Sequence, residues 1–393
     1  MKRAPPATVG RVPARGQKAV GTWSGGRYLR FGEAIDEARL QGLLRPGRGI
    51  DTVLTADAYG QGEADTLLGW AVGGVPRDGY RLIGAVGHDF YEGERDGPKG
   101  FPRFTDARLR GSDEYGSYLR MAAERSLERL GQDRFDVLLL HNPDRTGYES
   151  EEVWQGMAVL REEGLADAIG VAPGPANGFT LDLLSCFERF GELIDWAMII
   201  LNPFEPWPGE LCLPAAAQHE IRVITRVVDY GGLFWDDVTP ETELPPGDHR
   251  NFRPEGWIAD GRAKLERLRP LAERHQLTPM QLACQWNLAH DAVECVVPTL
   301  IQEAGEAARP IEEKRAELAA LAAEQLLSPD ETDEIRAIGD NAGCMALKGA
   351  SPDHTGDERP DRWPVTAELA DTGVRWGIDP LRDLRHLTAE PAR

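Results

Sequence analysis

The sequence has few of the residues that mark disulfide-bonded, zinc-binding, membrane-spanning or nucleic-acid-binding proteins. Its five cysteines are widely spaced, odd in number and never arranged as CxxC. They predict reduced thiols in a cytoplasmic protein, with neither a disulfide framework nor a zinc site. HExxH and HxxEH are also missing, so we predict no metal. No apolar run approaches the roughly 20 residues that a membrane span needs. The net charge of −21 argues against nucleic-acid and anionic-membrane partners and leaves a small-molecule substrate.

Short aliphatic runs alternate with amphipathic stretches about eight times along the chain. The runs predicted as strands are 19–23, part of 49–60, 80–86, 135–141, 167–172, 195–201, 221–225 and 294–298. The stretches predicted as helices are 33–44, 63–72, 114–130, 151–163, 181–190, 210–219, 261–275, 279–290 and 311–326. Such alternation requires a parallel sheet, and eight units predict a closed (β/α)8 TIM barrel of the α/β class. A doubly wound nucleotide-binding sheet is disfavoured because no GxGxxG follows the first strand.

The barrel is expected to occupy residues 17–339. Residues 1–16 are basic and proline-rich without an apolar stretch, so we predict a flexible segment and no secretory signal. The long loops 87–113 and 229–258 have the length of lids or binding loops. Residues 340–393 form an extension with Trp363 and Trp376. Two tryptophans favour packing against the body, over the barrel mouth; a free linker is the alternative.

The stretch 134-RFDVLLLHNPD-144 is the strongest candidate for a strand that carries chemistry. Its continuous apolar run suits a strand buried on both faces, and it ends on His141. In a parallel barrel, a polar side chain at the C-terminal end of a strand lies at the mouth, where reactions take place. We therefore predict a functional role for His141; a core histidine with satisfied hydrogen bonds is the alternative.

Five stretches together resemble the aldo-keto reductase superfamily over residues 17–335. They are 49-GIDTVLTADAYGQGEADTLLG-69, 127-LERLGQDRFDVLLLHNPD-144, 168-AIGVA-172, 201-LNPF-204 and 277-LTPMQLACQWNLAHDAVECVVP-298. The resemblance implies the barrel fold and a catalytic tetrad of Asp, Tyr, Lys and His around a substrate carbonyl. The Tyr falls on Tyr59 and the His on His141. Leu54 stands where the Asp belongs, and no lysine lies near Val86, where the Lys belongs.

The positions that hold NADP(H) in this superfamily also differ. The Ser-Asn pair that binds the nicotinamide amide falls on Ala172 and Pro173, and the Gln falls near Met198. The aromatic residue that stacks on the nicotinamide falls near Arg226. The segment 299-TLIQEAGEA-307, which should hold the 2′-phosphate, contains acids and no base. Losing one hydrogen bond to a charged group costs about 1.5–3 kcal/mol. These differences predict that the chain binds no cofactor in the superfamily's way.

Three functions are compatible with the sequence. The favoured one is cofactor-independent proton transfer on a carbonyl-bearing, sugar-like molecule or secondary metabolite, by elimination, isomerisation or retro-aldol cleavage. Tyr59 would donate to the oxyanion, and His141, expected to titrate near neutrality, would be the base. The alternative is an NADPH-dependent aldo/keto reductase. The third is a non-catalytic binding or regulatory barrel.

The remaining candidates lie at predicted strand ends. The residues assigned to substrate binding are Trp23, His88, Asn142, Asn202 and Arg226. Arg226 would clamp an anion because guanidinium binds carboxylate or phosphate through two hydrogen bonds; an ion pair with Asp229 or with another of the many acids is the alternative. His88 and Asp89 would form a second acid/base pair, or else a solvated turn.

Overall fold

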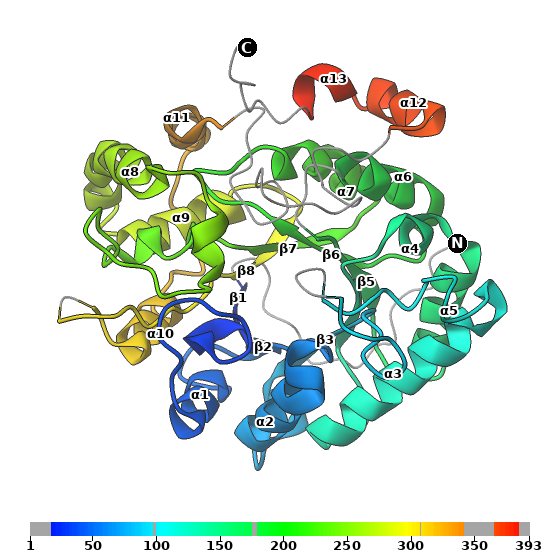
Figure 1. The fold of residues 1–393 in the computed structure, drawn as a ribbon. Coiled ribbons are helices and arrows are strands. Elements are labelled where there is room, and N and C mark those ends of the chain that lie inside the picture. Colours follow the sequence, from blue (N-terminus) through cyan, green and yellow to red (C-terminus); the bar gives the residue numbers. More distant parts are fainter. Residues whose placement is uncertain (1–16, 97–99, 175–178, 307, 342–364, 385–393) are drawn as a thin grey trace.

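Eight parallel strands close into a barrel in chain order, which confirms the predicted (β/α)8 fold (Figure 1). The computed structural model describes residues 17–96, 100–174, 179–306, 308–341 and 365–384. β1 pairs with both β2 and β8, so the barrel has no free strand edge. The strands are β1 (Gln17–Gly21), β2 (Thr52–Leu54), β3 (Arg81–Val86), β4 (Val137–His141), β5 (Ile169–Ala172), β6 (Trp196–Ile200), β7 (Arg222–Arg226) and β8 (Val293–Val297).

Helices surround the barrel and follow the predicted stretches closely. The helices of the barrel region are α1 (Glu37–Leu44), α2 (Glu63–Val72), α3 (Tyr115–Leu130), α4 (Arg145–Glu149), α5 (Glu151–Glu162), α6 (Thr180–Phe190), α7 (Leu213–Gln218), α8 (Trp257–Arg274), α9 (Pro279–Leu288), α10 (Ile311–Ala319) and α11 (Pro329–Gly339). Short 3-10 turns include η2 (Tyr59–Gly62) and η8 (His249–Phe252). α4 and α11 were not predicted from the sequence.

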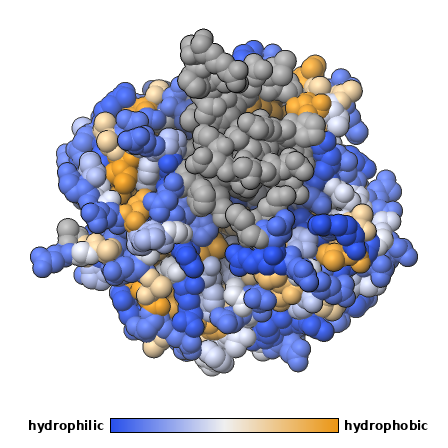
Figure 2. Space-filling model, viewed as in Figure 1, coloured by the Kyte–Doolittle hydropathy of each residue, from blue (hydrophilic) through white to orange (hydrophobic). Residues whose placement is uncertain are grey.

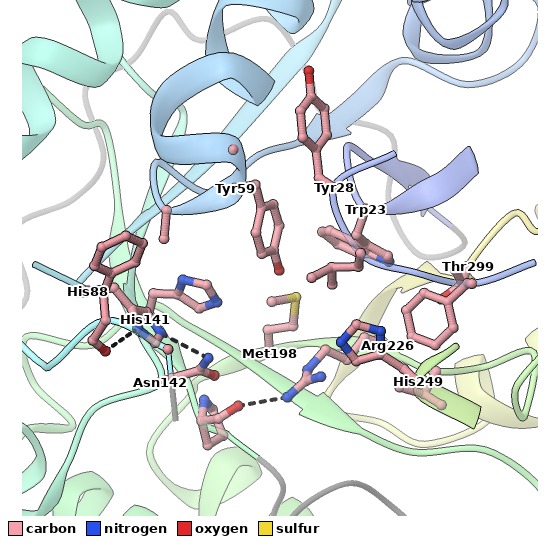
Figure 3. Close-up of a pocket in the computed structure, with 18 of the residues that line it drawn as sticks. Trp23, Tyr28, Tyr59, His88, His141, Asn142, Met198, Arg226, His249 and Thr299 are labelled. Atoms are coloured by element: carbon pink, nitrogen blue, oxygen red, sulfur yellow. Dashed lines mark hydrogen bonds between the residues drawn. The ribbon is translucent and has the colours of Figure 1, made fainter. Parts of the chain in front are cut away.

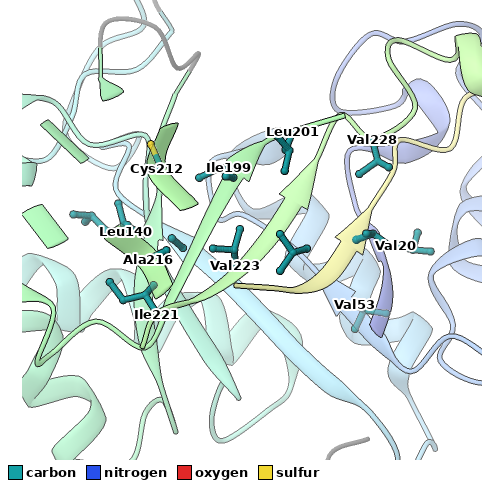
Figure 4. Packing of buried hydrophobic residues seen from close by; sticks show 14 of the residues in the cluster. Val20, Val53, Leu140, Ile199, Leu201, Cys212, Ala216, Ile221, Val223 and Val228 are labelled. Carbon is teal, nitrogen blue, oxygen red and sulfur yellow. The ribbon is translucent and has the colours of Figure 1, made fainter. Parts of the chain in front are cut away.

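Alternating residues of each strand supply two separate apolar layers. In β2, Val53 faces the helices, whereas Leu54 belongs to the cluster inside the barrel. Figure 4 shows the outer layer, where strand residues such as Val223 and Ile199 meet the helical Ala216. The inside cluster is filled by apolar side chains up to the level of Ala172 and Met198. A filled interior leaves the C-terminal ends of the strands as the place where a ligand can enter.

α10 ends at Ala319, so its predicted extent of 311–326 is wrong. The carbonyl oxygens of Ala319 and Leu321 accept hydrogen bonds from the Lys18 ammonium at 2.6 and 2.8 Å. The Gln285 amide donates to the carbonyls of Ala322 and Glu324 and accepts from Leu326 N–H. These side chains come from β1 and α9. Tertiary hydrogen bonds therefore replace the helical ladder that the local sequence favours.

Part of the C-terminal extension packs beside α6. Its described helices are α12 (Ala367–Arg375) and α13 (Pro380–Asp383), which lie next to α6 and α7 in Figure 1. Trp376 donates to the Glu188 carboxylate at 3.0 Å, and Arg375 forms an ion pair with the same group. Residues 1–16 and Trp363 lie outside the described residues, so the flexible start and the cover over the mouth stay predictions.

The face in Figure 2 is mostly hydrophilic and carries small, separate hydrophobic patches. Across the described ranges, no helix is long and apolar enough to cross a membrane. The same residues contain no group of three or more His, Cys, Asp or Glu side chains arranged to hold a metal ion.

Candidate functional site

A cavity of about 380 Å³ opens at the C-terminal ends of the barrel strands, where the loops that follow these strands meet (Figure 3). Six of the seven predicted site residues line it. They are Trp23, Tyr59, His88, His141, Asn142 and Arg226. Tyr28, Phe31, Phe101 and Met198 add apolar and aromatic walls. The structure thus brings together residues that lie more than 200 positions apart in the chain.

Tyr59 enters the cavity from a tight turn after β2. Gly60, Gln61 and Gly62 have φ angles of 59°, 53° and 95°, so the chain reverses sharply before α2. The phenol ring meets the His141 ring edge to face, with centroids 5.7 Å apart. Burial raises the pKa of Tyr59 to about 12, although the nearby positive charge of Arg226 opposes the shift. Tyr59 is therefore a neutral hydrogen-bond donor throughout the physiological pH range.

His141 is the last residue of β4 and is only 6% exposed. Burial, together with the positive charges of Arg103 and Arg226, lowers its pKa to about 3. The expectation that His141 titrates near neutrality is therefore wrong, because a desolvated imidazole beside two cations resists protonation. Its Nδ1 has no hydrogen-bond partner among the described residues. We assign the ring proton to Nε2, which leaves one N–H available to a ligand.

His88 lies beside His141, with ring centroids 5.0 Å apart. Its Nδ1 is 3.0 Å from a guanidinium nitrogen of Arg103, and its Nε2 is 3.2 Å from the side-chain nitrogen of Asn142. Burial lowers the pKa of His88 well below its usual value, and the Arg103 charge adds to this effect. Asn142 adopts a φ of 46°, which turns its side chain toward the ring. His88 and Asn142 thus form a neutral, hydrogen-bonded part of the cavity wall.

Arg226 ends β7 and reaches the cavity, and no carboxylate of the described residues pairs with it. Its Nη2 donates to the Pro173 carbonyl at 2.8 Å, and its buried Nε has no partner within the described part of the chain. The alternative prediction of an ion pair with Asp229 is wrong. Asp229 instead accepts from the backbone N–H groups of Gly232 and Thr299 at 2.8 and 2.7 Å. Burial lowers the pKa of Arg226, because the charged guanidinium loses part of its contact with water.

Asn202 does not reach the cavity, which corrects its assignment to substrate binding. Its carbonyl oxygen accepts from the N–H groups of Phe204 and Glu205, both at 2.9 Å. Its amide nitrogen donates to the Glu205 carboxylate and the Val227 carbonyl. All its hydrogen-bonding capacity therefore holds the turn after β6.

Asp89 likewise does not pair with His88 as an acid/base couple. Its carboxylate accepts from the N–H groups of Tyr91 and Glu92 and forms a buried ion pair with Arg110. The turn interpretation therefore holds for Asp89, although it is buried rather than solvated.

The ammonium–carboxylate couple of the tetrad is missing at the expected positions. Leu54 and Ala85, near the ends of β2 and β3, both belong to the apolar cluster inside the barrel. Asp57, two residues before Tyr59, is fully buried and does not line the cavity, and neither carboxylate oxygen has a partner among the described residues. Burial raises the pKa of Asp57 well above its usual value, and repulsion from Asp65 adds to the rise. Asp57 therefore does not replace the missing carboxylate.

Several lining residues were not predicted from the sequence. They are Tyr28, Leu29, Phe31, Arg95, Phe101, Met198, Val227, His249 and Thr299. Most belong to the loops after β1, β3 and β7. The length of the loops 87–113 and 229–258 was the available signal, because long loops at strand ends often bind ligands. No sequence pattern indicates which side chains of these loops turn into the cavity.

Comparison with known proteins identifies a family over most of the chain. The statistical model of the "Aldo/keto reductase family" matches residues 19–339. A 6-dehydroglucose reductase of Agrobacterium fabrum is 29% identical over 291 residues, covering 71% of this chain and 82% of the relative.

Solved structures show the same fold. A glycerol dehydrogenase of Gluconobacter oxydans is 21% identical, has a TM-score of 0.62, and is matched over 84% of this chain and 94% of its own. An aldo/keto reductase of Klebsiella pneumoniae, in complex with NADP and acetate, is 21% identical with a TM-score of 0.56. This match covers 86% of this chain and 95% of the other.

Proposed function

Because this chain belongs to the aldo/keto reductase family, we propose that it is an NADP(H)-dependent oxidoreductase that interconverts a carbonyl and an alcohol on a sugar-like small molecule. The observation that carries the proposal is the pair of neutral donors, Tyr59 and His141, which line one cavity with their ring centroids 5.7 Å apart. Relatives named as a reductase of a sugar derivative and as a glycerol dehydrogenase support the substrate class.

The cavity fits one end of a nicotinamide dinucleotide better than the other. Trp23, Met198, Val227 and Thr299 line a wall of the cavity and would hold the nicotinamide end. The 2′-phosphate end fits less well. In the loop after β8, the Glu303 carboxylate is buried and ion-paired with Arg250 at 2.6 Å. Any grip on the 2′-phosphate must therefore come from backbone groups or from outside this loop.

The bound nicotinamide would supply or accept the hydride. The chain's own residues would bind the substrate oxygen and transfer its proton. Tyr59 donates a hydrogen bond to the carbonyl oxygen and gives up its proton as negative charge develops there. The Nε2–H of His141 donates a second hydrogen bond to the same oxygen and stabilises that charge. The positive charge of Arg226 favours proton release because it opposes the rise in the pKa of Tyr59.

The site gives little support to cofactor-independent proton transfer, which the sequence favoured. Elimination, isomerisation and retro-aldol cleavage need a base, and the candidate was His141. A histidine with a pKa of about 3 is a very weak base at neutral pH. The named relatives also perform redox reactions. The lyase hypothesis and its expectation of no cofactor are therefore replaced by the reductase alternative. The cytoplasmic location stays a prediction.

A spectrophotometric assay tests the proposal. The purified protein is incubated with a panel of aldoses, ketoses and hydroxyketones, with and without NADPH, and absorbance is followed at the nicotinamide band. We expect carbonyl-dependent NADPH loss, and its absence from Tyr59→Phe. Turnover of the panel without NADPH would reinstate the lyase hypothesis. Binding of NADPH or sugar without turnover would favour the regulatory barrel.

A further inference from the structure

The described residues that line the cavity include no acid, although the protein is strongly acidic. The chain contains 65 Asp and Glu residues against 44 Lys and Arg residues. Among the described residues that line the cavity there is no Asp or Glu, whereas two are arginines, Arg226 and Arg95. Arg226 lies inside with Tyr59 and His141, and Arg95 is exposed. This distribution favours an anionic ligand.

Arg226 is half-buried at the cavity and differs in its partners from the buried arginines among the described residues. Arg110, Arg250 and Arg253 each form ion pairs with buried carboxylates, namely those of Asp89, of Asp248 and Glu303, and of Glu205. Arg226 instead donates to the Pro173 carbonyl, and its buried Nε is unpaired among the described residues. A guanidinium that is partly withdrawn from water, with its Nε buried and unpaired, is stabilised when an anion completes its surroundings. None of the described residues supplies that anion, so a ligand is the available source.

We propose that the substrate carries a carboxylate that binds to the Arg226 guanidinium while its carbonyl oxygen lies between Tyr59 and His141. This inference rests on the proposed function and narrows its substrate class to oxo acids and sugar acids. A carboxylate matches the fork of guanidinium donors through two parallel hydrogen bonds. The neutral Tyr59 and His141 do not compete for the anion, because neither carries a charge near neutral pH.

The position of Arg226 favours a substrate carboxylate over a dinucleotide phosphate. Arg226 and Tyr59 line the same cavity, and the charge of Arg226 opposes the rise in the pKa of Tyr59, so Arg226 lies near the reacting oxygen. In a nicotinamide dinucleotide, a ribose separates the reactive ring from the first phosphate. A phosphate would therefore lie farther from Tyr59, and Arg95 at the exposed side is better placed for it.

Two matched pairs of compounds test the inference by calorimetric binding. Glyoxylate is compared with glycolaldehyde, and D-glucuronate with D-glucose, because each pair differs by a carboxylate in place of a hydroxymethyl group. Titrations are made on the full chain, alone and with saturating NADP⁺, which supplies no hydride. For at least one pair, we expect the carboxylate to bind at least about tenfold more tightly, the effect of one charge-assisted contact. Arg226→Gln should abolish this preference, so that the two compounds of the pair bind with similar affinity. Arg226→Lys should retain part of it, and Arg95→Gln should keep it.

Each other result overturns the inference. If the wild type shows no preference for the carboxylate in either pair, Arg226 does not bind a substrate carboxylate. The same conclusion follows if the preference survives in Arg226→Gln. Inorganic phosphate that binds more tightly than both carboxylates would assign the site to a phosphate. A loss of NADP⁺ affinity in Arg226→Gln with the carboxylate preference intact would assign it to the cofactor. Failure of NADP⁺ to bind at all would count against the proposed function, and the titrations without NADP⁺ would still decide the role of Arg226.

Discussion

The two neutral donors predict that the reaction rate is nearly independent of pH between about 6 and 9. With a pKa of about 3, His141 would be protonated in about 0.1% of molecules at pH 6. With a pKa of about 12, Tyr59 would be ionised in about 0.1% of molecules at pH 9. Both groups thus keep the same protonation state across the range. We expect kcat, measured as initial rates at saturating NADPH and substrate and constant ionic strength, to change less than about twofold by this cause.

His141 acting as a base with an ordinary pKa would give a different profile. The rate would then fall about tenfold per pH unit below its inflection near pH 6.5. The matched control is His249, a second histidine that lines the cavity and is half-buried. An inflection that disappears in His141→Gln and persists in His249→Gln would refute the reasoning. The opposite pattern would assign the inflection to His249 and leave the reasoning intact.

Three further outcomes are expected. Tyr59→Phe and His141→Ala should each lower kcat about 10²–10⁴-fold in steady-state assays, since each removes a donor to the developing oxyanion; wild-type rates in either variant would exclude that residue from the reaction. Acidification should destabilise the fold through His141. The unfolded state takes up a proton on His141 below about pH 6.5, whereas the folded state does so only near pH 3. The free energy of unfolding should therefore be lower by about 2 kcal/mol at pH 5 than at neutral pH. Urea unfolding at several pH values should show a shallower acid slope for His141→Asn, and an unchanged slope would contradict the shift. Glu303→Ala should cost about 3–5 kcal/mol in urea unfolding because Arg250 loses a buried partner, whereas Asp167→Ala, at an exposed ion pair, should cost at most about 1 kcal/mol; equal costs would count against the burial argument.

The sequence predicted the barrel because its signals are local. The run ending at His141 reads as a buried strand from residue types alone, and β4 covers Val137–His141. Thr278 and Pro279 likewise predict the start of α9, which begins at Pro279 with Thr278 as its cap. Both features depend on neighbours in the chain, so no tertiary information was needed.

The parts that failed depend on contacts between distant segments. Asn202 follows a strand, as a ligand-binding residue would, but its side chain satisfies the backbone of its own turn. The end of α10 is set by Lys18, about 300 residues away. The low pKa of His141 arises from burial together with Arg103 and Arg226, which come from other loops and strands. A pattern of neighbouring residues contains no information on contacts between residues that are far apart in the chain.

The cavity residues come from two kinds of segment, the strand ends of the closed barrel and the loops that connect them to the helices. Tyr59, His141 and Arg226 lie at or just after strand ends whose register is fixed by pairing on both sides. Tyr28, Phe101 and His249 come from connecting loops that are no part of this ladder. Grafting a loop from another member of the family could thus exchange the compounds accepted while leaving the reacting groups in register. Natural divergence would have had the same freedom, so substrate choice is expected to vary faster here than the barrel itself.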